Sequence, residues 1–213
     1  MKPMKGLVVF DLEGVLVEGE LLVEIARLAG INHINRLTEA GLRGELPWEK
    51  SFNERMKLLK GVHREVVKKA GESLKVNEEA ENVVRELKRM GFKVYVVSGG
   101  FEGTASAVKE RLGLDGYVVN RMVFRDQSLD GWELKVRDKG RIVRELKEKL
   151  SPPVTITVGD GANDIPMFKE GIGVAYRAKG TAREHAKFSI DRLEELLKIA
   201  ASFTRAPGPA HKP

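Results

Sequence analysis

The sequence predicts an α/β fold, a Rossmann-like doubly wound parallel sheet with a small all-helical cap inserted after the first strand. Short apolar runs alternate with helical segments over most of the chain, which is typical of a parallel sheet with right-handed crossovers. Residues from about 18 to 73 interrupt this alternation and carry only helical spacing. The 213 residues, 42% of them hydrophobic, suffice for one core domain with a modest insertion.

The first strand and the inserted helices follow from the N-terminal third of the chain. Residues 6–10 form a short apolar run before a polar turn, as expected for a buried parallel strand. Apolar residues then recur at helical spacing from Leu21 to Ala29, and Gly30 ends that helix. Further helices fit residues 34–42, 47–60 and 63–72. We predict a helical cap at 17–74, inserted into a core made of 1–16 and 75–204.

Beyond residue 75, strands and helices alternate. Asn77 is expected to cap a helix that ends near Gly91. Strands are expected at 92–97, 154–158 and 171–175, and helices at 101–112, 138–150 and 191–203, with a short helix around 167–168. Two extended segments, 117–124 and 132–136, would form a flap. The proline-rich tail at 205–213 is expected to be disordered.

Composition narrows the class of partner. The chain has 37 Lys and Arg against 31 Asp and Glu, and the resulting charge of +6 is spread through mixed-sign helical segments, which indicates solvated surface rather than a nucleic-acid stripe. The absence of cysteine excludes disulfides and thiolate sites and fits a cytoplasmic protein. We expect a small-molecule substrate, no nucleic-acid or membrane partner, and a monomer or homodimer.

Three polar clusters follow three of the predicted strands, where ligands bind in a doubly wound sheet. The first is Asp11-Leu-Glu13-Gly14, whose two carboxylates can face one crevice if Gly14 turns the chain. Asp11 could attack phosphorus and form an aspartyl-phosphate, and Glu13 could protonate the leaving oxygen and then activate water. The same residue types are common in ordinary turns after strands, so this cluster alone decides little.

The other two clusters add groups for an anion and a metal. Residues 98–100, Ser-Gly-Gly, precede a predicted helix, where a hydroxyl and free amides can hold an anion, although an ordinary helix cap would look the same. Residues 159–164 place Asp160 and Asp164 four positions apart beside Asn163 and two glycines. Mg²⁺ typically takes one or two such carboxylates together with phosphate oxygens and waters. The third cluster is therefore the most specific.

Taken in order, these clusters and Lys139 resemble the four signature motifs of the haloacid dehalogenase (HAD) superfamily of phosphatases, with the resemblance running from Gly6 to about Leu197. The order is Asp-x-acid, Ser, Lys and Gly-Asp-Gly-x-x-Asp. The resemblance implies a HAD fold, Mg²⁺ as the cofactor and a phosphomonoester as the substrate.

The resemblance also implies a role for each matching residue. Asp11 would be the nucleophile, and Glu13 the acid and base. Mg²⁺ would be held by Asp11, the main-chain carbonyl of Glu13 and Asp160, with Asp164 acting through a water. The phosphate would be bound by Ser98, Gly99, Gly100, Lys139 and Asn163.

Within the superfamily, the chain most resembles the phosphoserine phosphatases. Residues 97–101 and 158–164 match that family nearly letter for letter, as does the Asn-Arg pair at 120–121 before the flap. In that family a Glu and an Arg hold the ammonium and the carboxylate of the substrate, and Glu20 and Arg55 stand at the matching places. Without the resemblance, both would be read as ordinary charges on a helix surface.

One position departs from the family, because its second acid is usually Asp and here is Glu13. A misplacement of about 1 Å can cost about 10²-fold in rate. Asp-Leu-Glu-Gly-Val-Leu also resembles the phosphoserine:homoserine phosphotransferases, which pass the phosphoryl group to a hydroxyl other than water. We expect phosphoserine hydrolysis first and this transfer second. A remote third alternative, an inactive binding protein of the same fold, is disfavoured by the full set of charged residues.

Overall fold

A seven-stranded sheet forms the centre of the computed structural model, which describes residues 3–178 and 180–204. The strand order is β4-β3-β2-β1-β5-β6-β7, and every neighbouring pair is parallel except β3 with β4. The strands are β1 (Gly6–Phe10), β2 (Phe92–Phe101), β3 (Gly116–Arg125), β4 (Ser128–Glu133), β5 (Thr155–Gly159), β6 (Ile172–Tyr176) and β7 (Phe188–Ile190). The predicted α/β class is confirmed.

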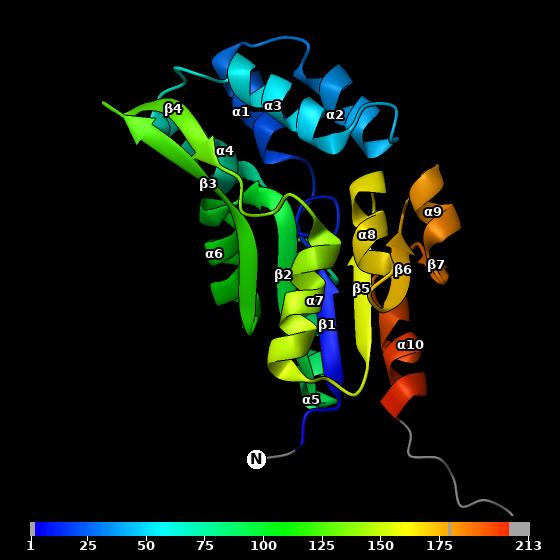
Figure 1. Ribbon diagram of the computed structural model, residues 1–213. Helices are drawn as coiled ribbons and strands as arrows, with labels where there is room; N and C mark the ends of the chain where they lie inside the picture. The colour runs from blue at the N-terminus through cyan, green and yellow to red at the C-terminus, as the bar shows by residue number, and fades with distance from the viewer. Residues whose placement is uncertain (1–2, 179, 205–213) are drawn as a thin grey trace, which may run out of the picture.

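Helices cover both faces of the sheet (Figure 1). One face packs against α5 (Ala80–Arg89), α6 (Glu102–Leu112) and α10 (Glu195–Thr204), and the other against α7 (Lys139–Leu150), α8 (Ile165–Phe168) and α9 (Thr181–His185). Val8 and Phe10 of β1 belong to the first core and Leu7 and Val9 to the second, which explains why this strand is a continuous apolar run. None of the helices in the described ranges is long and apolar enough to cross a bilayer.

The cap lies above the carboxyl ends of the strands (blue to cyan in Figure 1). Its helices are α1 (Leu21–Ala29), α2 (Ile34–Leu42), α3 (Trp48–Leu58) and α4 (Arg64–Ser73). Their apolar side chains form a separate core around Ile25, Phe52 and Met56. The chain enters and leaves the cap side by side, since Val17 and Val76 form an isolated bridge. The helical insertion after the first strand is confirmed, and its limits at 17 and 74 stay a prediction.

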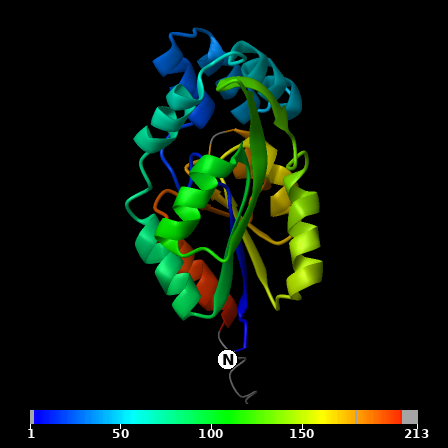
Figure 2. The same ribbon diagram turned by 90° about the vertical axis from the view of Figure 1, so that its left-hand side faces the viewer.

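The β3–β4 hairpin extends beyond the sheet and reaches the cap (green in Figure 2). Its far end hydrogen-bonds to the loop between α3 and α4, where Gly61 N donates to Leu129 O at 2.8 Å. The predicted start of the second flap segment at residue 132 is wrong: β4 begins at Ser128, and only Asp126 and Gln127 separate the two strands, with φ values of 47° and 64°. Two residues at positive φ form a tight turn whose twist matches the strands, so pairing resumes earlier than expected, at Ser128.

Two element boundaries differ from the prediction, and two short elements are additional. Strand β2 continues through residues 98–100 instead of ending before them. β7 and α9 are additional elements, three and five residues long, too short to produce a periodic pattern. α10 begins at Glu195 because its Oε1 accepts from the amides of Asp191 and Arg192, which form a turn before the helix. The predicted tail at 205–213 lies outside the described residues.

Candidate active site

Four polar segments meet at the carboxyl end of the sheet, under the cap. Asp11 follows β1, residues 98–100 lie near the end of β2, and Asp160 and Asp164 follow β5. Lys139 is the first residue of α7. Because β1 lies between β2 and β5, the order of the strands brings the groups on either side together around Asp11.

Lys139 forms two buried ion pairs at the centre of the site. Its Nζ lies 2.8 Å from Asp11 Oδ2 and 2.6 Å from Asp164 Oδ1. Burial alone would lower the pKa of Lys139, but the two carboxylates outweigh it and hold the pKa above its ordinary value. A cation at a helix N-terminus costs about 0.3–1 kcal/mol, and Asp138 offsets this by accepting from the Gly140 amide. This lysine is therefore a buried, charged group rather than a solvated surface residue.

Asp164 uses both oxygens within the site. Its Oδ1 binds Lys139, and its Oδ2 accepts from the amides of Asp160 and Gly161, both at 3.0 Å. A Cβ at position 159 would lie 2.3 Å from this carboxyl group, so only Gly159 allows the approach. Burial raises the pKa of Asp164 to about 6, although Lys139 opposes the shift. One ammonium therefore does not neutralise the acids gathered here.

The acids form a group that could hold a metal ion. Asp11, Asp160 and Asp164 each offer an oxygen, and these atoms lie within 4.8 Å of one another. Asp160 Oδ1 is buried and has no hydrogen-bond partner in the described part of the chain. Burial, followed by the charges of Asp164 and Asp11, raises the pKa of Asp160 well above its ordinary value. Clustered carboxylate oxygens of this kind are the donors that a hard divalent cation prefers.

Glu13 lies between Asp11 and the cap, and Gly14 makes the turn that places it there. Gly14 has φ +80°, and a Cβ at this position would lie 2.2 Å from Asp160 Oδ2. Glu13 is buried, and its Oε1 has no hydrogen-bond partner among the described residues. Burial, then the charges of Glu20 and Asp11, raise the pKa of Glu13 well above its ordinary value. The shift favours the protonated form that a proton donor needs.

Residues 98–100, called the glycine loop below, interrupt the pairing of β2 with β3. The register of the two strands shifts across the loop, so it is a bulge at the end of β2, and α6 follows it at Glu102 as predicted. The Gly100 amide donates to Ser98 Oγ at 3.1 Å. A Cβ at Gly99 would lie 2.5 Å from the Trp48 ring, so the cap and the glycine loop are in direct contact.

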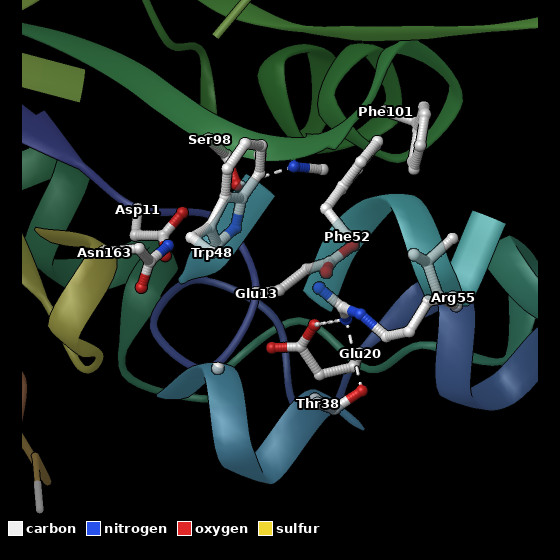
Figure 3. A pocket seen from close by; sticks show the side chains of 14 residues that line it. Asp11, Glu13, Glu20, Thr38, Trp48, Phe52, Arg55, Ser98, Phe101 and Asn163 are labelled. Carbon is white, nitrogen blue, oxygen red and sulfur yellow. Dashed lines mark hydrogen bonds and ion pairs between the residues drawn. The ribbon is translucent and has the colours of Figure 1, made fainter. Parts of the chain in front are cut away.

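Arg55 and Glu20 face the same cavity from the cap (Figure 3). Arg55 is 6% exposed, and its Nη1 lies 3.7 Å from Glu20 Oε2 and donates to Thr38 Oγ1 at 3.1 Å. Burial raises the pKa of Glu20, and the charge of Arg55 opposes the shift. Because Asp11 and Ser98 line the opposite wall, the two cap charges belong to the site and not to the outer surface.

The structure brings all the predicted site residues to one place. Asn163 lines the cavity with an Oδ1 that has no hydrogen-bond partner in the described ranges, and Lys139, Asp160 and Asp164 lie next to Asp11. Thr38 and Phe52 are further wall residues that the sequence does not single out. A lone threonine or phenylalanine in a helix carries no signal beyond helical spacing.

Known proteins resemble this chain along most of its length. A family model described as haloacid dehalogenase-like hydrolase matches residues 6–171. Phosphoserine phosphatase of Archaeoglobus fulgidus is 39% identical over 94% of this chain, which spans 62% of that protein's length. Phosphoserine phosphatase of Methanocaldococcus jannaschii is 39% identical over 93% of this chain and 99% of its own. A solved structure, a phospho-aspartyl intermediate analogue of phosphoserine phosphatase, has a TM-score of 0.89 at 37% identity and covers 92% of this chain and 99% of its own.

Proposed function

The chain belongs to the haloacid dehalogenase-like hydrolases, and we propose that it hydrolyses phosphoserine to serine and phosphate through an aspartyl-phosphate on Asp11. The observation that carries this proposal is one cavity with Asp11 on one wall and the Arg55–Glu20 pair on the other. A phosphate group would bind at Asp11 while an amino-acid end reaches the cap. The similarity to two phosphoserine phosphatases over most of the chain supports the same substrate.

The acidic cluster fits Mg²⁺, which we propose as the cofactor. Asp11, Asp160 and the main-chain carbonyl of Glu13 would hold the ion, and Asp164 would act through a water. Two observations on Asp160 support the fit. Its Oδ1 has no hydrogen-bond partner in the described residues, and a cation would give it one. Its pKa is raised, and a cation would stabilise the ionised form. When bound, such an ion neutralises negative charge on the phosphoryl oxygens.

In the first step, an oxygen of Asp11 attacks phosphorus, and the bond between phosphorus and the serine oxygen breaks. Lys139 Nζ holds Asp11 Oδ2 at 2.8 Å, and the Leu12 amide fixes the orientation of the carboxylate by donating to Oδ1 at 2.7 Å. Glu13 gives its proton to the departing serine oxygen. The products of this step are free serine and a phosphorylated Asp11.

In the second step, water attacks the phosphorus of the aspartyl-phosphate, and the Glu13 carboxylate takes a proton from that water. Phosphate leaves, and Asp11 and the protonated Glu13 are restored. In both steps the Ser98 hydroxyl, the glycine-loop amides, Lys139 and Asn163 stabilise the charge on the phosphoryl oxygens. The contact of the cap with the glycine loop closes the cavity and excludes bulk water during transfer.

The ammonium and carboxylate groups of the substrate would bind to Glu20 and Arg55 and replace the contact that these two side chains make with each other. Arg55 presents a rigid guanidinium that matches a carboxylate, and Glu20 presents a carboxylate that matches an ammonium group. The two side chains lie 3.7 Å apart at their nearest atoms, so both ends of a zwitterion would meet a partner. A sugar phosphate offers neither charge, so it would leave Arg55 and Glu20 without new partners.

Transfer to homoserine is the second candidate function, and Glu13 is the residue that favours it. The longer side chain places its Oε1 3.1 Å from where a Cβ on Gly100 would lie, at the wall of the cavity. This carboxyl group would deprotonate whichever hydroxyl attacks the aspartyl-phosphate. Homoserine carries the same zwitterionic end as serine and would meet the same pair, Arg55 and Glu20.

The proposed function is tested by measuring phosphate release from a panel of phosphomonoesters with Mg²⁺, in the presence and absence of homoserine. We expect phosphoserine to react faster than sugar phosphates and phosphoethanolamine. Equal rates on phosphoserine and sugar phosphates would defeat the amino-acid assignment. Phosphohomoserine as the main product would mean that the enzyme transfers the phosphoryl group to homoserine and that hydrolysis is not its main reaction.

Binding of Mg²⁺ is expected to weaken as the pH falls through about 6. Burial raises the pKa of Asp160 above its ordinary value and that of Asp164 to about 6, so these carboxyl groups take up protons as the pH falls, and Mg²⁺ must displace those protons. With one proton released, the dissociation constant rises about tenfold for each pH unit below that range. Titration calorimetry at pH 7.5 and at pH 5 measures the difference, and equal affinities would show that these carboxyl groups do not hold the ion.

Replacing Arg55 by methionine is expected to raise the KM for phosphoserine by about 10²-fold, because a buried charge-assisted hydrogen bond to the carboxylate is lost. The rate on phosphoethanolamine, which lacks the carboxylate, should change little. Arg27→Met on the exposed face of the same cap is the control, since Arg27 pairs only with Glu24 in the described contacts. A similar loss on both substrates would mean that Arg55 supports the cap and not the choice of substrate.

A further inference from the structure

Asn120 in β3 is a fully buried polar residue that no step described above employs. Its Nδ2 donates to Gly99 O at 2.9 Å, and its Oδ1 accepts from Lys135 N at 2.9 Å and from Val136 N at 3.0 Å. A carbonyl can only accept and a backbone amide can only donate, so these partners fix the orientation of the Asn120 amide. The side chain joins two separate backbone segments.

The bond to Gly99 fills a gap in the sheet. β2 and β3 pair as far as Val97 with Val118 and again at Phe101 with Asn120, so the glycine loop bulges out of the ladder. The bulge takes the Gly99 carbonyl and the Gly100 amide out of the regular pairing, and the Gly100 amide donates to Ser98 Oγ instead. Asn120 supplies the hydrogen bond that the ladder would have given this carbonyl.

The same bond sets the direction of the next amide. In a planar trans peptide, the carbonyl of one residue and the N–H of the next point in opposite directions. Because Asn120 holds Gly99 O on the β3 side, the Gly100 N–H points away from β3, where it lies 3.1 Å from Ser98 Oγ. Ser98 and Gly100 both line the cavity. Two consecutive glycines have wide conformational freedom, so this peptide needs an external tie to hold one orientation.

The other end of the Asn120 amide holds the segment that leads to Lys139. Lys135 and Val136 follow β4, and Asp138 just beyond them caps α7. Val136 is 2% exposed and belongs to the same core as α7. One side chain therefore fixes the glycine loop and the approach to the lysine relative to each other.

We propose that Asn120 is a positioning residue for phosphoryl transfer, which directs the Gly100 N–H and Lys139 toward the phosphoryl oxygens without touching the substrate. This inference rests on the proposed function. Charge on those oxygens is stabilised most in the transition state, so misdirected donors lower kcat more than they raise KM.

The variant Asn120→Asp tests the role. It keeps the acceptor for Lys135 and Val136 and replaces the donor to Gly99 O by an oxygen. We expect kcat on phosphoserine to fall about 10²-fold, with KM little changed. The control is Asp115→Ala, at the other end of the β2–β3 pair. It removes the hydrogen bond that Val94 N donates to Asp115 Oδ2 at 2.9 Å, and it should lower the unfolding temperature without changing kcat.

A wild-type kcat in folded Asn120→Asp would overturn the inference. If that variant does not fold, Asn120→Ser repeats the test, since it removes the bonds without burying a charge and should show the same loss of kcat.

A measurement on the wild type separates this inference from the proposed function. In ¹⁵N-labelled wild-type protein, the Gly100 amide resonance should shift when inorganic phosphate and Mg²⁺ are added. An unchanged resonance would overturn the positioning role, whatever the activity. If the Gly100 resonance shifts but the enzyme releases no phosphate from phosphoserine, the proposed substrate is rejected and the positioning role is kept.

Discussion

Replacing Asp11 by asparagine is expected to reduce phosphate release by about 10⁴-fold or more, because loss of a covalent nucleophile removes the reaction path itself. Asparagine has nearly the same shape and can still face Lys139, so the fold should persist. Removing one of the clustered acids also relieves repulsion in the metal-free site. Steady-state phosphate release and thermal unfolding of the variant measure both effects.

The control for this substitution is Asp115→Asn, an isosteric change at the far end of the sheet, where Asp115 pairs with Lys93 at 2.7 Å. It should leave the rate unchanged. Activity of Asp11→Asn within tenfold of wild type would mean that water attacks the substrate directly and that no aspartyl-phosphate forms. Loss of activity in Asp11→Asn also excludes the inactive binding protein, provided that the wild type releases phosphate.

Replacing Lys139 by methionine is expected to lower kcat by about 10³-fold and to destabilise the metal-free protein by about 3 kcal/mol. The rate falls because a cation at the phosphoryl oxygens is lost, and the stability falls because two buried carboxylates lose their partner. Mg²⁺ should restore more stability to this variant than it adds to the wild type, since the ion then becomes the main counter-charge. Activity assays and denaturant unfolding with and without Mg²⁺ measure these changes.

Lys149→Met, on the exposed face of the same helix, is the matched control and should change neither quantity. If Lys139→Met kept its stability but lost activity, the lysine would serve the substrate alone. Unchanged activity would remove Lys139 from the proposed mechanism.

The residues that follow strands were the most predictable part of the site. Asp11 and Asp160 stand directly after short apolar runs, and the carboxyl ends of parallel strands meet at one edge of a sheet. The continuous apolar run at 6–10 predicted a buried parallel strand, and both faces of β1 are buried in the structure. Local pattern and topology agree at these positions, so the place of both acids at one edge of the sheet was predictable, whereas the role of Asp11 came from the family resemblance.

Residues that depend on contacts between distant segments were not predictable from pattern. Lys139 carried no signal of its own, and only the family resemblance pointed to it before the structure showed it buried against Asp11 and Asp164. Arg55 would have been read as a surface charge, because its burial depends on how α2 and α3 pack. The bulge at the glycine loop depends on the β2–β3 register, which the spacing of apolar residues does not specify.

The most direct test of the proposed mechanism is mass spectrometry of the enzyme quenched in acid within its first turnover of phosphoserine with Mg²⁺. We expect a phosphoryl group on the peptide that contains Asp11, absent without Mg²⁺ and absent from Asp11→Asn. Rapid phosphate release with no phosphorylated peptide, or with the phosphoryl group on another residue, would contradict the aspartyl-phosphate mechanism.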